Sequence, residues 1–388
     1  MKQPKEHQAQ PKTVRNKSNL PDNIVRKNNQ IMTQCKEIEQ SLPSFLRDYC
    51  LYIKNAVAVS SRLAYLSDLR FFLHYLISEH PDFQEFSSIQ EITLDRFQSL
   101  KARDINYFIG EYCARYETES AIVENHNRSL ARKRSSLSVM FKYLFRDELM
   151  DSNLVDGFNP IKLPKPQPDS IKKLEIEEVR RMLEIVETGK DLTEKERVFW
   201  EKTKLRDKAI LVLFITYGLR VSELQQLDLD SIHYARNDFR IFRKRGKEVR
   251  MPLNHSALTC LRDYIERERP ESIDTDDPLF LSLQRKRMTV RSIRDLVVKY
   301  TSLAMEKPRN SGYSPHKLRA TAASSLIEYG FSIYDVQNLL DHENVTTTQL
   351  YAAHRRNSKR DLIRQYEVLD GSQEMSTAKI SPDDPLDK

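Results

Sequence analysis

The sequence predicts a mainly α-helical protein with a small antiparallel β-sheet, divided into a helical domain and a second, mixed α+β domain. Three observations support this fold class. The 388 residues are enough for two domains of ordinary size. Residues 157–173, GFNPIKLPKPQPDSIKK, form a proline-rich stretch that reads as an extended connector. Apolar residues recur at helical spacing on both sides of this connector. Only one region, residues 232–253, shows the alternation of apolar and polar residues that is typical of strands.

These patterns predict five segments along the chain. We expect a basic, disordered N-terminal segment, a helical domain, the connector, a second domain and a disordered C-terminal tail, in that order. Residues 1–40 are rich in Lys, Arg, Asn, Gln and Pro and carry too few large apolar residues to offset the entropy of ordering. The expected ranges are 1–40, 41–156, 157–173, 174–370 and 371–388.

Composition narrows the class of protein. The net charge of +7 suits a polyanionic partner, although an ordinary solvated surface explains it equally well. The four cysteines have no paired spacing, which argues against a disulfide framework and a zinc site and favours a reducing compartment. No apolar run approaches the roughly 20 residues that span a bilayer. We therefore expect a soluble, intracellular protein with no membrane partner.

The first domain reads as four helices between about residues 42 and 150. Leu66, Leu69, Leu73 and Leu76 form one apolar stripe, a third helix starts near Asp104, and a fourth runs from about residue 128 to 149. The fourth helix leaves a basic face for contact with DNA or for simple solvation. The candidate DNA-binding residues of this face are Arg128, Arg132, Arg134 and Lys142.

The second domain begins with helical patterns and then turns to strands. Residues 209–217, AILVLFITY, are apolar all round, as expected of a helix at the centre of a domain, and Gly218 ends it just before Arg220. Residues 232–242 and 249–253 alternate as strands, with a turn at Asn237 and Asp238. The basic turn RKRGKE, residues 243–248, lies between the later strands.

Near the C-terminus, a helix is predicted from Pro315 to Tyr329. Ser314 supplies an N-cap side chain, proline is favoured at the first helical position, and Gly330 suits the left-handed position after the end. His316 and Arg319 are three residues apart and therefore share a face of this helix.

Two shorter helices should follow. Ser332 with Asp335, and Thr346 with Gln349, each have the spacing of a capping box. His342 then falls in the turn between these helices, and Tyr351 lies one turn into the last. Each of these side chains taken singly has an ordinary structural explanation, but their order along the chain is distinctive.

The second domain resembles the tyrosine recombinase family, which includes phage integrases and Xer-type site-specific recombinases. YGLRVSEL (217–224) is similar to the first arginine box, FRKRGKEVRMPL (242–253) to the lysine hairpin, SPHKLRAT to the His-x-x-Arg box and LLDHENVTTTQLY to the segment ending in the nucleophile. Lys247 is an alternative to Lys244 by one register change, and is otherwise a candidate DNA contact. The catalytic residues implied are Arg220, Lys244, His316, Arg319, His342 and Tyr351. The first domain resembles the family's core-binding domain by architecture alone.

The chemistry of these side chains agrees with that resemblance. Two guanidinium groups can bind the non-bridging oxygens of a phosphodiester and stay charged at any accessible pH. A tyrosine with an ordinary pKa of about 10 needs a base or a positively charged pocket to become a nucleophile, and His316 suits that role. Lys244 suits protonation of the departing 5′ oxygen, and His342 suits either a hydrogen bond to the phosphate or the positioning of Tyr351.

The resemblance also implies the substrate and the assembly. It implies cleavage of double-stranded DNA at a specific recombination site through a 3′-phosphotyrosyl bond, with no metal or nucleotide cofactor. It implies a homotetramer on two DNA sites in the bacterial cytoplasm, associated with the nucleoid, with a second recombinase or accessory protein as an open question. Residues 354–369, HRRNSKRDLIRQYEVL, are expected to dock on a neighbouring protomer, with folding back on their own domain as the alternative. Dimer resolution, DNA integration and inversion are not distinguished.

Three departures and three rival functions remain. Ala320, Asp341 and Arg243 stand where many members have histidine, glycine and glycine. The rivals are a type IB topoisomerase, a non-catalytic DNA-binding regulator of the same fold, and a metal-dependent nuclease or transposase. Retention of Arg220, Arg319 and Tyr351 argues against a regulator, because binding alone does not require that set.

Overall fold

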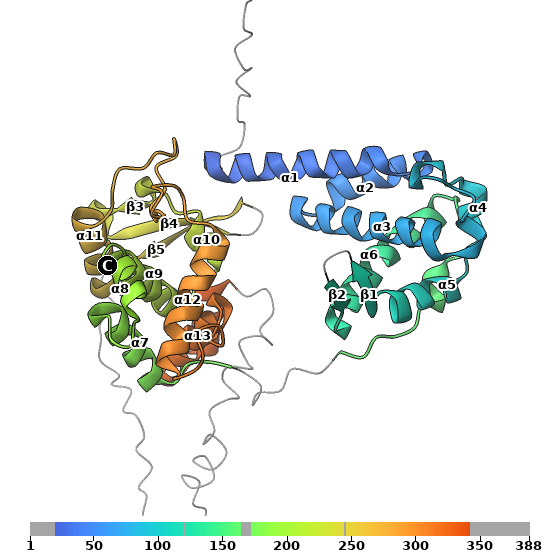
Figure 1. The fold of residues 1–388 in the computed structure, drawn as a ribbon. Helices are drawn as coiled ribbons and strands as arrows, with labels where there is room; N and C mark the ends of the chain where they lie inside the picture. The colour runs from blue at the N-terminus through green and yellow to red at the C-terminus, as the bar shows by residue number, and fades with distance from the viewer. Residues whose placement is uncertain (1–19, 119–120, 164–171, 244–245, 342–388) are drawn as a thin grey trace, which may run out of the picture. The chain divides into compact units, whose positions relative to one another are not determined.

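The computed structural model describes residues 20–118, 121–163, 172–243 and 246–341 (Figure 1). The chain separates into two compact units. The first comprises residues 1–165, 222–254 and 270–288, and the second comprises residues 166–221, 255–269 and 289–388. The break at residue 165 falls inside the predicted connector, and the extent of each functional domain stays a prediction.

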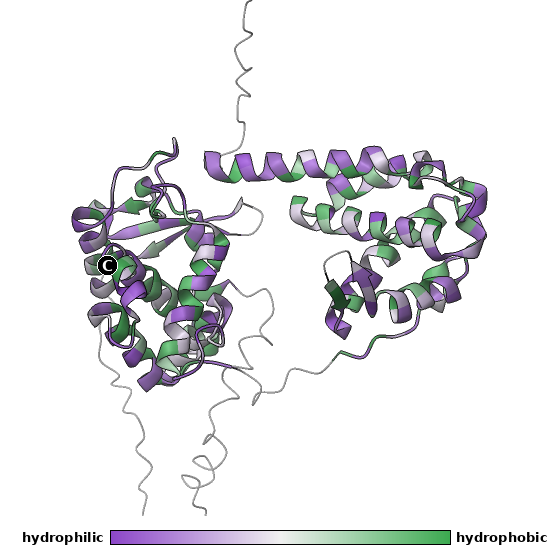
Figure 2. Cartoon of the chain, viewed as in Figure 1, coloured by the Kyte–Doolittle hydropathy of each residue, from purple (hydrophilic) through white to green (hydrophobic). Residues whose placement is uncertain are grey.

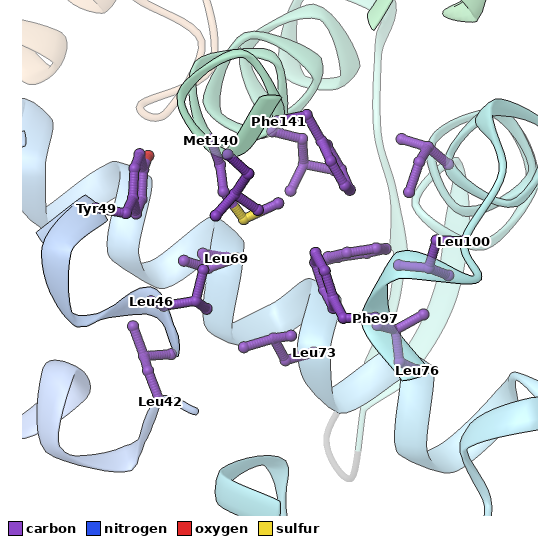
Figure 3. Packing of buried hydrophobic residues seen from close by; sticks show 14 of the residues in the cluster. Leu42, Leu46, Tyr49, Leu69, Leu73, Leu76, Phe97, Leu100, Met140 and Phe141 are labelled. Carbon is purple, nitrogen blue, oxygen red and sulfur yellow. The ribbon is translucent and has the colours of Figure 1, made fainter. Parts of the chain in front are cut away.

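The first unit is built mainly from helices around one hydrophobic core (Figure 3). Helix α3 is central, because α1 and α6 both pack along it. Leu69 and Leu73 of α3 lie in the core with Phe97 of α4 and Phe141 of α6. The third predicted helix divides into α5 and a π-helical turn, Phe108–Tyr112. The helices are α1 (Asp22–Ser41), α2 (Arg47–Ala56), α3 (Val59–Glu79), α4 (Leu94–Gln98), α5 (Ala102–Tyr107) and α6 (Asn127–Arg146).

Helix α1 corrects the prediction of disorder for residues 22–40, whereas residues 1–19 lie outside the described residues. Most of its residues are hydrophilic, as Figure 2 shows, so its composition resembles that of a disordered segment. However, Cys35 and Ile38 are buried, and Glu39 accepts a hydrogen bond from Arg62 of α3. Tertiary packing of a narrow apolar stripe therefore stabilises a helix that propensity alone would not.

A β-hairpin in the first unit was not predicted either. Strand β1 (Arg115–Thr118) pairs antiparallel with β2 (Ala121–Glu124). The ring of Tyr116 stacks on Tyr112 and packs against Phe71, at centroid distances of 6.2 and 5.1 Å. One aromatic residue thus fixes a strand in a stretch whose other side chains are mostly exposed.

The predicted antiparallel sheet is confirmed. Its strands are β3 (Ile232–His233), β4 (Asp238–Phe242) and β5 (Glu248–Pro252), in the order β3-β4-β5. Phe239 pairs with Met251 on its buried face. Asn237 has a φ of +50°, a left-handed conformation that asparagine tolerates, and so makes the predicted turn before β4. With the helices, this sheet confirms the mainly α fold class.

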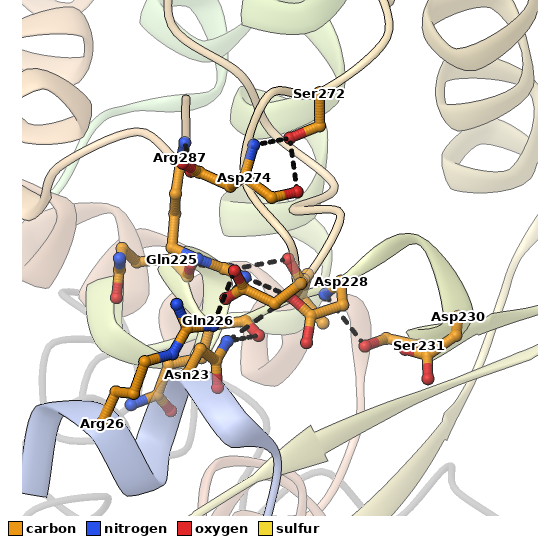
Figure 4. Close-up of polar contacts among 12 residues, drawn as sticks. Asn23, Arg26, Gln225, Gln226, Asp228, Asp230, Ser231, Ser272, Asp274 and Arg287 are labelled. Carbon is orange, nitrogen blue, oxygen red and sulfur yellow. Dashed lines mark hydrogen bonds and ion pairs between the residues drawn. The ribbon is translucent and has the colours of Figure 1, made fainter. Parts of the chain in front are cut away.

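A polar cluster around Arg287 connects distant segments of the first unit (Figure 4). Its guanidinium group donates hydrogen bonds to the carbonyl oxygens of Gln225 and Leu227, and forms ion pairs with Asp228 and Asp276. Helix α1 joins this cluster through its first turns. Asn23 donates to the carbonyl oxygen of Gln226 at 3.0 Å, and Arg26 forms an ion pair with Asp276 at 2.8 Å.

The second unit is helical and is organised around α9 (Lys204–Tyr217), the predicted buried helix. Helices α7, α11 and α13 all pack against α9. The carboxylate of Glu268 accepts hydrogen bonds from the backbone N–H groups of Leu205 and Arg206, which fixes the start of α9. The short helix α10 (Val221–Gln225) follows α9 in the chain and, from Ser222 on, belongs to the first unit. The other helices are α7 (Ile176–Thr188), α8 (Glu194–Trp200), α11 (His255–Arg267), α12 (Val290–Ala304), α13 (Pro315–Tyr329) and α14 (Ile333–Leu340).

None of the helices in the described part of the chain is long and apolar enough to cross a membrane.

Candidate active site

Helix α13 has the predicted bounds and carries two of the predicted catalytic residues. Pro315 occupies the first turn, and Gly330 adopts a left-handed conformation with a φ of +113° after the end. The predicted side-chain cap at Ser314 is wrong. Its backbone carbonyl oxygen, rather than its hydroxyl, accepts the first helical N–H groups, those of Lys317 and Leu318. Pro315 has no N–H group, so this turn has one donor fewer to satisfy. The carbonyl oxygen of Ser314 accepts from the next donors without help from its hydroxyl group.

Arg319 is held in place by two backbone carbonyl groups. The residue is only 3% exposed. One terminal nitrogen of its guanidinium group donates to the carbonyl oxygen of Gly218, 2.6 Å away, and the other donates to that of Leu340. The side chain therefore joins the end of α9 to the end of α14, and its position depends on both.

Arg220 is held by the next carbonyl along the chain. Its Nη2 atom donates to the carbonyl oxygen of Asp341 at 3.1 Å. Leu340 and Asp341 are consecutive residues at the end of α14, so that end accepts hydrogen bonds from both arginines. The structure thus brings together the two predicted phosphate-binding side chains.

Gly218 allows the ends of α9 and α14 to approach closely. It has a φ of +57° and caps α9 by donating to the carbonyl oxygen of Phe214. A Cβ atom at this position would lie 2.6 Å from Cδ2 of Leu340. Glycine is therefore required both by the backbone conformation and by the neighbouring side chain.

His316 lies within electrostatic range of both arginines. Its side chain reaches solvent at the first turn of α13. Partial burial of the imidazole, followed by the positive charges of Lys317, Arg319 and Arg220, lowers the pKa of His316 below its ordinary value. The ring is consequently neutral near pH 7, which is the form that can accept a proton.

The capping box predicted at the start of α14 is confirmed. Ser332 accepts from the N–H of Asp335, and the Asp335 carboxylate accepts from the N–H of Ser332. At the other end, Asp341 has a φ of +52°, where glycine is the usual residue. The backbone therefore tolerates this departure from the family pattern in a left-handed conformation.

Three predicted catalytic residues lie outside the described residues. These are Lys244, His342 and Tyr351, together with the predicted cap pair Thr346 and Gln349. Lys247 is described and exposed, and its carbonyl oxygen accepts from the N–H of Arg243 at 2.8 Å. Within the described ranges, no group of three or more His, Cys, Asp or Glu side chains is arranged to hold a metal ion.

The predicted DNA-binding residues of α6 divide into two groups. Arg128 and Lys142 are exposed, as expected of a DNA contact. Arg132 instead forms two hydrogen bonds with the buried carboxylate of Asp68 on α3. Arg134 donates to the carbonyl oxygen of Phe158 at 3.4 Å, and its guanidinium group lies 5.8 Å from that ring. Packing within the unit therefore accounts for Arg134 and for part of Arg132, which the helical pattern could not distinguish.

Comparison with known proteins identifies the family. The model of the phage integrase family matches residues 172–358. The tyrosine recombinase XerC of Natranaerobius thermophilus is 34% identical over 235 residues, which cover 59% of this chain and 73% of that protein. This chain is a tyrosine recombinase of the phage integrase family.

Other relatives match more of this recombinase. XerC of Caldanaerobacter subterraneus subsp. tengcongensis is 29% identical over 80% of this chain and 82% of its own length. XerD of Listeria innocua is 28% identical over 81% of this chain and 95% of its own length. Both relatives are tyrosine recombinases, and they give no support to the topoisomerase alternative.

Solved structures share the fold. The XerH recombinase bound to its difH substrate before cleavage matches with a TM-score of 0.54 at 16% identity, over 87% of this chain and 94% of that chain. A lambda integrase dimer bound to a core site matches with a TM-score of 0.52 at 16% identity, over 78% of this chain and 96% of that chain.

Sequence reasoning missed the backbone groups that hold the arginines of this recombinase. The carbonyl groups of Gly218, Leu340 and Asp341 perform that role, and any residue type has a carbonyl group. The sequence did contain one indication, Gly218 at the end of a fully apolar helix. It predicts a left-handed turn there, but not that Leu340 and Arg319 pack against that turn.

Proposed function

We propose that this recombinase cleaves and rejoins double-stranded DNA at a specific site through a 3′-phosphotyrosyl intermediate formed by Tyr351. The observation that carries the proposal is the placement of Arg220 and Arg319 on consecutive carbonyl groups, with a neutral imidazole, His316, in electrostatic range. Two permanent cations beside a proton acceptor suit in-line attack on a phosphodiester.

In the cleavage step, Arg220 and Arg319 stabilise the negative charge that develops on the non-bridging oxygens. Neutral His316 accepts the phenolic proton as the oxygen of Tyr351 attacks phosphorus. The bond from phosphorus to the 5′ oxygen breaks, and Lys244 donates a proton to that oxygen. Rejoining reverses each transfer with the 5′ hydroxyl of a partner strand, so that the number of phosphodiester bonds is conserved.

The exposed cations of α6 support contact with the DNA backbone. Arg128, Arg132 and Lys142 recur at intervals that place them on one side of this helix. Arg132 keeps about half of its side chain exposed beside Asp68, so it still contributes positive charge to that side. Phosphate contacts of this kind orient a protein on the duplex without reading its sequence.

Assembly and location follow from the named relatives as part of the same proposal. One solved neighbour is a lambda integrase tetramer bound to a Holliday junction. We infer a homotetramer on two DNA sites, acting at the nucleoid in a bacterial cytoplasm, with residues 354–369 docking on a neighbouring protomer.

A covalent trap tests the proposed chemistry. The full chain is incubated in EDTA with nicked suicide duplexes that carry candidate recombination sites, and the products are separated on a denaturing gel. We expect an adduct with the wild type and none with Tyr351→Phe, because the variant lacks only the attacking oxygen. Loss of the adduct in EDTA, or its persistence in Tyr351→Phe, would contradict the proposal. Recombinant products from two-site substrates distinguish strand exchange from relaxation.

A further inference from the structure

The first unit contains a groove between α1 and α2 that the proposed DNA chemistry does not use. Its volume is about 500 Å³, within the range of binding pockets in proteins. Met32, Lys36, Glu39 and Gln40 line it from α1, at the spacing of one helical face. That face extends for about 12 Å, or roughly two helical turns.

Helix α2 lines the opposite wall in the same way. Arg47, Cys50, Leu51 and Lys54 are spaced three, four and seven residues apart and share one face of α2. Two helical walls with this spacing form a channel in which a third helix can lie, as in other helix-in-groove complexes.

The floor of the groove is apolar. Leu42 and Leu46 are buried in the core beneath it (Figure 3). Burial raises the pKa of the Cys50 thiol to about 12, so this side chain stays neutral and contributes apolar surface. Leu51 is 55% exposed and Met32 is 37% exposed at the edges. The groove therefore offers apolar contacts that a purely solvated face would not retain.

The upper edges of the groove are positively charged. Arg62 is paired with Glu39, which neutralises the one carboxylate that lines it. Lys36, Arg47 and Lys54 are exposed, and none of them forms an ion pair among the residues that the structure describes. An apolar floor between positively charged side chains is complementary to an amphipathic helix that has Asp or Glu residues on either side of its apolar face.

The groove faces away from α6, the helix that carries the candidate DNA-binding residues. Tyr49 and Tyr52 of α2 pack against Tyr143 of α6, at ring distances of 5.6 and 5.0 Å. At 100° per residue, these two tyrosines lie on the side of α2 opposite to Cys50 and Leu51. The face of α2 that lines the groove is consequently separate from the face that supports α6.

We propose that this groove is a docking site for an acidic amphipathic helix of a partner protein. The partner helix places apolar side chains at i, i+3 or i+4, and i+7 over Met32, Leu42 and Leu51. Its Asp or Glu side chains pair with Lys36, Arg47 and Lys54. The side chains that line this site are different from the candidate catalytic residues, so the two roles can be tested separately.

A peptide-display selection tests the site. Helix-forming peptides of about four turns with randomised surface positions are selected on the full-length protein. The same library is counter-selected on the Leu51→Glu variant. We expect enriched peptides to combine helical apolar spacing with net negative charge. Absence of enrichment over the counter-selected variant would overturn the proposal.

Binding of an enriched peptide is then measured by fluorescence anisotropy. Leu51→Glu and Lys54→Glu should each weaken binding roughly tenfold or more. Arg103→Glu changes a cation that is 79% exposed on α5 and serves as the matched control, with unchanged binding expected. Equal peptide affinity for wild type and both groove variants would contradict the site.

Two other occupants are separate outcomes of the same experiment. If Lys54→Glu weakens duplex DNA binding as strongly as peptide binding, and DNA displaces the peptide, the groove is a DNA contact. If the protein associates without DNA and Leu51→Glu abolishes that association in sedimentation, the occupant is a second copy. Either result overturns the assignment to a different protein.

Discussion

Arg319 combines a proposed chemical role with a structural one. Its buried guanidinium group satisfies two carbonyl oxygens, those of Gly218 and Leu340. Arg319→Ala should therefore abolish cleavage and also lower the free energy of unfolding by about 3 kcal/mol, because two buried acceptors lose their donors. Urea denaturation followed by the fluorescence of Trp200, the single tryptophan, measures the effect in the second unit.

Arg220 is the matched control for that prediction. It is less buried than Arg319, and its Nη2 atom donates to the carbonyl oxygen of Asp341. Arg220→Ala should abolish cleavage while lowering the free energy of unfolding by about 1 kcal/mol or less. Equal destabilisation by the two variants would show that the carbonyl contacts of Arg319 are not structural.

His316 gives a pH dependence with a definite sign. Its folded-state pKa lies below the ordinary histidine value of about 6.5, through partial burial and neighbouring cations. As the pH falls below about 6.5, the unfolded chain binds the proton first, so the free energy of unfolding decreases toward the folded pKa. Above about 6.5 the neutral ring contributes its full stability.

An NMR titration of the His316 imidazole tests this directly. We expect a midpoint below about 6.5 in the DNA-free protein, and a higher midpoint in Arg220→Ala, because one of the three neighbouring cations is gone. A midpoint at or above the ordinary value in the wild type would remove the argument that His316 is a neutral base.

At the scale of elements, the contact between the ends of α9 and α14 determines where both arginines lie. Gly218→Ala should lower the free energy of unfolding by about 3 kcal/mol, since it combines a left-handed backbone with overlap against Leu340. The expected change is visible in Trp200 fluorescence during urea denaturation.

A double-mutant cycle separates the two causes. Leu340→Ala removes the atom that lies 2.6 Å from the added Cβ, so Gly218→Ala should cost less in that background, with only the backbone strain left. Additive effects of the two substitutions would mean that α14 already shifts to accommodate the methyl group.

Elements with strong local signals were predictable, and elements fixed by distant contacts were not. Proline at the start and glycine at the end gave the bounds of α13, and an all-round apolar run gave α9. Helix α1 depends on Cys35 and Ile38 meeting α3, and the β1–β2 hairpin depends on Tyr116 meeting Phe71. The spacing of apolar residues within a short stretch of sequence does not predict either of these long-range contacts.

The same distinction applies to the site. Spacing placed His316 and Arg319 on one helix face, and the order of motifs suggested that Arg220 joins them. Both arginines donate to backbone oxygens that are distant in the sequence. Leu340 is 21 residues from Arg319, and Asp341 is 121 residues from Arg220. A carbonyl group has no signature in a sequence, so only the folded chain shows which of them hold the guanidinium groups.

For the whole molecule, the net charge of +7 is less informative than where its cations lie. DNA affinity should fall with salt, and each lost phosphate contact should reduce the slope of log K against log [salt] by about 0.9. Arg128→Ala combined with Lys142→Ala should therefore reduce the slope by about 2, with similar loss on specific and non-specific duplexes. Arg134→Ala removes one positive charge, from a side chain packed on Phe158, and should leave the slope unchanged. Fluorescence anisotropy across a salt series decides between them, and equal slopes for all variants would exclude α6 from the DNA interface.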